Sequence, residues 1–204
     1  MKIVKRITGF TFAVVITIPF IIGFIKADMK EQGYTPAEPT PATSYISELD
    51  TTEIEIPCDV DLTAKTYMDY RKITDETSPQ WEYIYSDAIT VDEKGFLVTE
   101  DNFVGVALGS YFGPIGEKYQ ITLDSGIVLN VVKVEEKADM HTCEHNVMAG
   151  CNDVIEFVID TQAEYMQNNV WDNGYIWQGN FNNCPDFTGD IQKIEKVIGY
   201  EDQV

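Results

Sequence analysis

The chain has 204 residues, of which 34 are Asp or Glu and 14 are Lys or Arg, so its formal net charge is -20. A protein that grips the phosphate backbone of DNA or RNA needs the opposite charge, and nucleic acid is therefore excluded as a partner. Hydrophobic residues make up 44% of the sequence, which is ordinary globular usage and allows a buried core.

An uncharged segment lies near the start of the chain. Residues 7–25 contain 19 residues without a charge, between Arg6 and Lys26. A helix of that length, at about 1.5 Å per residue, spans roughly 28 Å, close to the hydrocarbon thickness of a bilayer. A cleaved signal peptide has a shorter apolar core of about 7 to 15 residues. We therefore expect a single transmembrane anchor, with secretion after cleavage or a buried core helix as the alternatives.

The charges around this segment predict its orientation. Lys2, Lys5 and Arg6 precede it, and basic residues favour the cytoplasmic side, so residues 1–6 are expected in the cytoplasm. Residues 27–204 carry 34 acids and 10 bases, a net charge of -24. The predicted protein is a single-pass protein of the cell membrane with its C-terminal domain outside the cell.

Residues 26–57 are acidic and rich in proline and threonine, with little apolar material to bury. Such a composition predicts a disordered linker that holds a folded domain, residues 58–204, away from the membrane. The alternative is that residues 54–57 form an edge strand.

The domain that follows has the pattern of a mainly β protein. β-rich runs at 95–98 and 103–108 are followed by a hairpin, in which residues 119–123 and 127–134 flank the turn Asp124-Ser125-Gly126. Further strands are expected at 153–160 and 191–198, and short helices after Ser78-Pro79 and at 162–168. Many short strands with few helices favour a closed or semi-closed β-barrel.

Two positions have the residue types of an acid/base site. Glu156 is the single charge within an otherwise apolar strand, and Asp139 stands two positions before His141. A carboxylate near an imidazole can exchange protons with a substrate, each group tuning the pKa of the other. The alternative is a polar loop in which Asp139 and His141 cap the neighbouring backbone.

Both histidines lie close to two of the four cysteines. His141, Cys143, His145 and Cys151 have the donor atoms that zinc prefers, although their spacing matches no familiar finger. In an exported protein the simpler expectation is a disulfide between Cys143 and Cys151 and another between Cys58 and Cys184. Four cysteines allow three pairings, and free thiols are a further alternative.

Aromatic and amide side chains alternate across residues 165–183. Aromatic faces stack on the C–H faces of sugars while amides bind hydroxyls, so Trp171, Tyr175 and Trp177 are candidate glycan-binding residues. The alternative is that Trp171, Trp177 and Phe181 close the barrel as core residues.

Motifs for nucleotides and for common hydrolases do not occur. Residues 113–118 have the wrong glycine spacing for a phosphate-binding loop, and the chain has neither a Gly-x-Ser-x-Gly nor a His-Glu-x-x-His motif. The functional site is therefore predicted to work without a cofactor, and zinc is an alternative only for the cysteines and histidines above.

Four consecutive features together resemble the three-aspartate (3D) domain of Gram-positive cell-wall proteins. They are residues 114–121, the glycine turn, a second strand that leads to Asp139, and the sequence Val154-Ile155-Glu156-Phe157. That family belongs to the double-psi β-barrels, and the resemblance covers residues 103–160. Asp139 matches the second aspartate of its pattern and Glu156 the third, whereas Gly109 stands at the position of the first.

The resemblance implies a double-psi-like β-barrel that acts outside the cell. It implies cell-wall glycan or a surface protein as partner, bound without turnover because one aspartate is missing. The alternative that it implies is a lytic-transglycosylase-like enzyme that cleaves peptidoglycan strands, with Asp139 as general acid and Glu156 and His141 as its neighbours.

Overall fold

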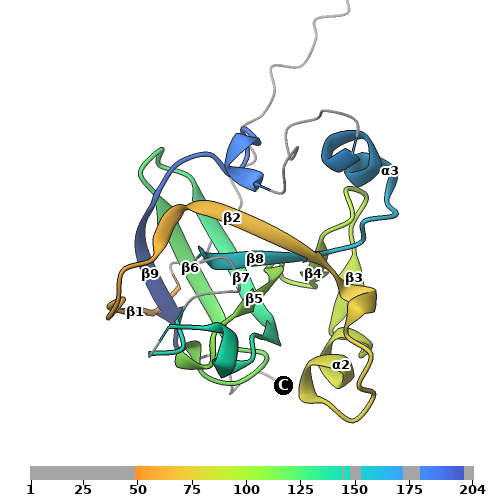
Figure 1. Cartoon of the computed structure of the whole chain (residues 1–204), viewed down its shortest axis with the longest axis horizontal. Helices are drawn as coiled ribbons and strands as arrows, with labels where there is room; N and C mark the ends of the chain where they lie inside the picture. Colours follow the sequence, from red (N-terminus) through yellow and green to blue (C-terminus); the bar gives the residue numbers. More distant parts are fainter. Residues whose placement is uncertain (1–48, 144, 148–152, 172–179, 200–204) are drawn as a thin grey trace, which may run out of the picture. The chain divides into compact units, whose positions relative to one another are not determined.

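A computed structural model describes residues 49–143, 145–147, 153–171 and 180–199. Within these residues the fold is a nine-stranded sheet with a few short helices (Figure 1). The strands are β1 (Thr51–Glu53), β2 (Asp61–Asp69), β3 (Ile89–Val91), β4 (Leu97–Thr99), β5 (Val104–Leu108), β6 (Lys118–Leu123), β7 (Val128–Glu136), β8 (Asp153–Ile159) and β9 (Ile191–Val197). The expected mainly β class with short helices is confirmed.

The helical elements are one turn or slightly longer. They are the α-helices α2 (Pro79–Ile84) and α3 (Glu164–Met166), the 3₁₀-helices η1 (Tyr70–Lys72), η2 (Ser110–Phe112), η3 (Asp139–His141) and η6 (Phe181–Asn183), and the π-helix η4 (Gln167–Trp171). Helix α2 begins as predicted: Ser78 accepts a hydrogen bond from the Trp81 N–H at 3.2 Å, and Pro79 is its first residue.

The strands follow the order β1-β9-β6-β7-β5-β4-β3, and β8 joins the sheet by pairing with both β5 and β2. Two of these pairs, β5 with β7 and β2 with β8, are parallel, and the remaining pairs are antiparallel. Strand β2 also contacts β9. Parallel neighbours place the carboxyl ends of their strands at the same edge, which is where the candidate site lies.

The hairpin of β6 and β7 shows why the sequence folds in this way. Residues of β6 alternate between buried and partly exposed, which matches the period of two in the sequence. The turn between the strands contains Gly126 at a φ of 86°, a left-handed conformation that glycine adopts without strain. All six predicted strands and both predicted helices occur within a few residues of their expected places, whereas β2 and β3 had not been predicted.

Apolar side chains pack on both faces of the sheet. One core cluster contains Val106, Leu108 and Phe157 together with an aromatic group around Phe181. The other contains Ala107, Val134 and Val158. Successive residues of β5 therefore contribute to opposite clusters, which requires both faces of this central strand to be covered.

The predicted anchor and the predicted linker fall largely outside the residues that the structure describes. The expected anchor, residues 7–25, lies outside the described residues, and among the residues that are described no helix is long and apolar enough to cross a membrane. The last part of the expected linker is described. There β1 pairs antiparallel with β9, and the Ile54 N–H donates to the Ile194 carbonyl at 2.8 Å, so an edge strand forms slightly before residues 54–57.

Candidate functional site

Three glutamates and two lysines gather where β5 and β7 end beside β8. Ala107 of β5 pairs with Glu135 of β7 on one side and with Glu156 of β8 on the other. Paired residues of neighbouring strands point to the same face, so both carboxylates flank the small side chain of Ala107. We call Glu135, Glu136, Glu156, Lys133 and Lys137 the carboxylate cluster.

A β-bulge gives Glu135 this position. Val106 pairs with Lys133, but the next residue, Ala107, pairs with Glu135, so Val134 is an extra residue of β7. A regular register would place Glu135 opposite Leu108, which belongs to the apolar core on the other face. Bulges redirect side chains in this way and are common beside functional sites.

Lys133 holds the loop beside the cluster in place. Its side chain is fully buried, and its ammonium group donates to the Gly109 carbonyl at 3.0 Å, to the Gly113 carbonyl at 2.5 Å and to the Glu136 carboxylate at 2.7 Å. All three N–H donors of the ammonium are thus used. This lysine therefore joins β7 to both ends of η2.

The two glutamates that flank Ala107 have different environments. Glu156 forms an ion pair with Lys137. Burial raises the pKa of Glu135, with the charge of Glu156 acting in the same direction, while Lys137 opposes the shift. Among the described residues, Oε2 of Glu135 finds no hydrogen-bond partner. Glu135 therefore keeps its proton to higher pH than an ordinary glutamate does.

The predicted acid/base residues Asp139 and His141 lie in η3, and both are exposed. Asp139 accepts a hydrogen bond from the Ser110 hydroxyl at 2.6 Å, so η3 and η2 are joined. Glu156 of β8 has a different partner, Lys137, which follows β7 on the other side of β5. The structure thus places the predicted residues around one edge of the sheet and gives Asp139 and Glu156 separate partners.

Gly109, at the position expected for the first aspartate, has no room for a side chain. A Cβ atom at this residue would lie 2.0 Å from the carbonyl oxygen of Asn146. Asn146 itself is held by hydrogen bonds from Tyr111 and to Cys143, so the backbone there is not free to move aside. An aspartate at this position would therefore clash with the backbone of Asn146.

The cysteines are arranged differently from the pairing favoured by their sequence context. The sulfur atoms of Cys58 and Cys143 lie 2.7 Å apart, and Cys184 is buried elsewhere in the core, 3.9 Å from the Tyr165 hydroxyl. Cys151 lies outside the described residues. In the described part of the chain, no group of three or more His, Cys, Asp or Glu residues is arranged to hold a metal ion.

The predicted glycan-binding aromatics fall mostly outside the description. Trp171 is the last residue of η4, while Tyr175 and Trp177 lie outside the described residues. Phe181, named with Trp171 and Trp177 in the alternative core assignment, is fully buried against Phe157 and Phe96. That alternative is confirmed for Phe181.

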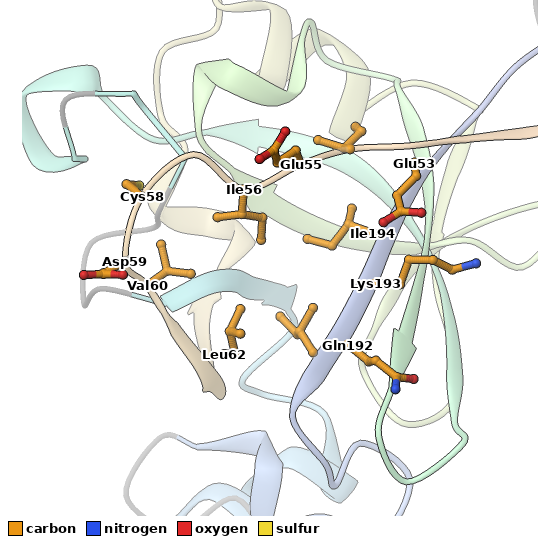
Figure 2. A pocket seen from close by; sticks show the side chains of 12 residues that line it. Glu53, Glu55, Ile56, Cys58, Asp59, Val60, Leu62, Gln192, Lys193 and Ile194 are labelled. Carbon is orange, nitrogen blue, oxygen red and sulfur yellow. The ribbon is translucent and has the colours of Figure 1, made fainter.

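The structure also contains a groove that the sequence did not indicate. It has a volume of about 370 Å³ and lies between β9 and the chain from β1 to the start of β2 (Figure 2). Apolar side chains such as Ile56 and Ile194 line it together with the acids Glu53, Glu55 and Asp59. Its two walls are distant in the sequence, so no local pattern could reveal it.

Sequence reasoning found Glu156, because a charge within an apolar strand is visible in the sequence, but it missed Glu135, Lys133 and Lys137. Their signal is the run of charges that ends β7, which looks like an ordinary strand end until the parallel partner β5 is known.

Comparisons of the chain with protein-family models, with curated proteins and with solved structures found no match.

Proposed function

We propose that the chain is a membrane-anchored extracellular domain that binds cell-wall glycan without turning it over. The observation that carries the proposal is the ion pair between Glu156 and Lys137. Glu156 stands where the family resemblance expects a catalytic carboxylate, and Lys137 binds it there. We therefore assign ligand binding to the exposed polar residues of η3.

The strand arrangement supports a double-psi-like barrel. Six strands follow one another as β2-β8-β5-β7-β6-β9, and the contact of β2 with β9 brings the two ends of this series together. The series contains two parallel pairs among antiparallel ones. Mixed pairing within a short series of strands whose ends lie near each other is consistent with the proposed barrel.

The edge formed by Ser110, Asp139, His141 and Glu136 has suitable chemistry for a glycan. These side chains are partly or fully exposed, and they offer a hydroxyl, two carboxylates and an imidazole. Sugar hydroxyls both donate and accept hydrogen bonds, so such a mixed set of groups binds them well. A surface protein is the other partner class that this edge accommodates.

Turnover is disfavoured by the state of the two inner carboxylates. A general acid must be protonated and must reach the oxygen of the leaving group. Glu156 is held by Lys137, and Oε2 of Glu135 is enclosed by protein. Neither group therefore presents a proton to a sugar bound at the exposed edge.

One observation favours the alternative, a peptidoglycan-cleaving enzyme. The raised pKa of Glu135 beside the ion-paired Glu156 resembles the division between proton donor and charged partner in glycoside-cleaving enzymes. In this alternative Glu135, rather than Asp139, donates the proton, after a movement that exposes it.

Binding is tested by sedimenting the full chain, kept in detergent, with purified peptidoglycan. We expect the wild type to sediment with the wall material, and Asp139→Asn to weaken binding about fivefold, the factor for a hydrogen-bond contribution of about 1 kcal/mol. The matched control is Asp87→Asn, which removes the same charge from an exposed residue outside the cluster. Equal loss in both variants, or no sedimentation of the wild type, contradicts the proposal.

The same incubation distinguishes binding from cleavage. Our proposal expects no soluble sugar products from the wild type. If soluble glycan fragments appear with the wild type and disappear with Glu135→Gln, the enzyme alternative is correct and the proposal of binding without turnover is wrong.

A further inference from the structure

Two cysteines far apart in the sequence meet beside the candidate site. The sulfur atoms of Cys58 and Cys143 lie 2.7 Å apart, and the two residues are 85 positions apart in the chain. A disulfide bond is about 2.0 Å long, so an approach of only about 0.7 Å joins the two atoms. Both side chains are partly buried and pack against the main core.

The backbone on both sides is held by the same residue. The Tyr111 hydroxyl donates to the Glu55 carbonyl at 2.7 Å, close to Cys58 in the chain. The Tyr111 N–H donates to the Asn146 carbonyl at 3.1 Å, and the Asn146 N–H in turn donates to the Cys143 carbonyl at 2.8 Å. The two cysteine-bearing segments therefore meet through hydrogen bonds that do not involve sulfur.

We propose that Cys58 and Cys143 form a disulfide in the mature protein. The two thiols lose two protons and two electrons as the S–S bond forms, and an oxidised thiol–disulfide partner accepts them and becomes a dithiol. This chemistry suits the extracellular location of the proposed function, where disulfides persist. It differs from the pairing of Cys143 with Cys151 and Cys58 with Cys184 that the sequence favoured.

The bond would connect the groove to the segment that carries the exposed edge. Cys58 lines the groove between β9 and the chain that follows β1 (Figure 2), and Cys143 follows η3, which carries Asp139 and His141. A covalent link between them fixes the end of the groove and the position of the exposed edge at the same time. Reduction would release both.

The test is disulfide mapping of the full chain after incubation with oxidised glutathione. We expect two of the four thiols to disappear and a non-reducing digest to yield one linked peptide pair that contains Cys58 and Cys143. A linked pair of Cys143 with Cys151, or glutathione adducts on separate cysteines, would overturn the proposal. This readout does not depend on glycan binding, so it separates a failure here from a failure of the proposed function.

Two variants make the test specific. The double variant Cys151→Ser with Cys184→Ala retains only the proposed pair and should still form the link. Cys143→Ser removes the proposed partner of Cys58 but keeps Cys151, and we expect that Cys58 is then no longer disulfide-linked. Should a variant fail to fold, the wild type alone decides: we expect its thermal midpoint to fall by about 5 °C or more on reduction, whereas an unchanged midpoint together with an unlinked Cys58 refutes the proposal.

Discussion

At the scale of single residues, Glu135 is the group whose chemistry the fold alters most. Burial raises its pKa, and its Oε2 has no hydrogen-bond partner among the described residues. We expect Glu135→Gln to raise the free energy of unfolding at neutral pH by about 1 kcal/mol, because the amide has nearly the same shape but never carries the charge that burial disfavours. Chemical denaturation of wild type and variant measures this difference.

The pH dependence gives this prediction a sign that can be checked. A carboxyl whose pKa is raised on folding binds its proton more tightly in the folded state, so the wild type loses stability as pH rises from the unfolded pKa through the folded one. The stability that Glu135→Gln gains over the wild type should therefore grow over that pH range and level off above it. A gain that is constant across pH would mean that the charge of Glu135 is not involved.

At the scale of elements, one carboxylate joins the ends of β2 and β8. Asp69 accepts hydrogen bonds from the Arg71 side chain and from the Thr161 N–H at 3.0 Å. Burial raises the pKa of Asp69, but these hydrogen bonds lower it more and hold it at about 2, below its ordinary value of 3.8. Arg71 also pairs with Asp160, the residue after β8, at 2.7 Å.

Asp69→Asn should therefore loosen the contact between β2 and β8. We expect a loss of about 2 kcal/mol in the free energy of unfolding at pH 7, since one pKa unit corresponds to about 1.4 kcal/mol. Because the folded pKa lies below the unfolded one, this contribution is complete above the unfolded pKa and disappears as pH falls toward 2. Urea unfolding at several pH values tests it, with exposed Asp87→Asn as the control; equal losses in both variants would contradict it.

Strand β2 also shows what sequence patterns miss. The predicted strands were those whose burial depends on apolar residues, such as β8 and the β6–β7 hairpin. In β2 the buried positions include Lys65, whose ammonium donates to Asn182 at 3.0 Å and to the Gly189 carbonyl at 2.6 Å. Buried polar residues are compatible with a strand only when distant partners satisfy them, and those partners are invisible to a local pattern.

At the scale of the whole molecule, the candidate site is partly predictable for the same reason. Glu156 is noticeable in its apolar strand, and Asp139 stands two positions before His141, so both could be chosen from the sequence. Glu135 becomes part of the site only through the parallel pairing of β5 with β7 and the bulge at Val134. Pairing between strands separated by another element depends on the complete fold, which single-sequence patterns do not determine.

The net charge of the molecule leads to a prediction about its partner. Residues 27–204, the predicted linker and domain together, carry a charge of -24, so anionic polymers of the proposed cell-wall partner would repel them over distances set by the Debye length. Raising the salt concentration from about 0.1 M to about 1 M shortens that length from about 10 Å to about 3 Å. We therefore expect sedimentation with whole cell walls to increase with salt, the opposite of the behaviour of a basic binder.

Purified peptidoglycan without its anionic polymers provides the control for this effect. There the repulsion is smaller, so the dependence on salt should be weaker while the effect of Asp139→Asn on binding stays the same. If binding to whole walls instead falls as salt rises, attraction between opposite charges dominates the contact. The partner would then be a cationic surface protein, the second class that we propose for the exposed edge near η3, and glycan would not be the ligand.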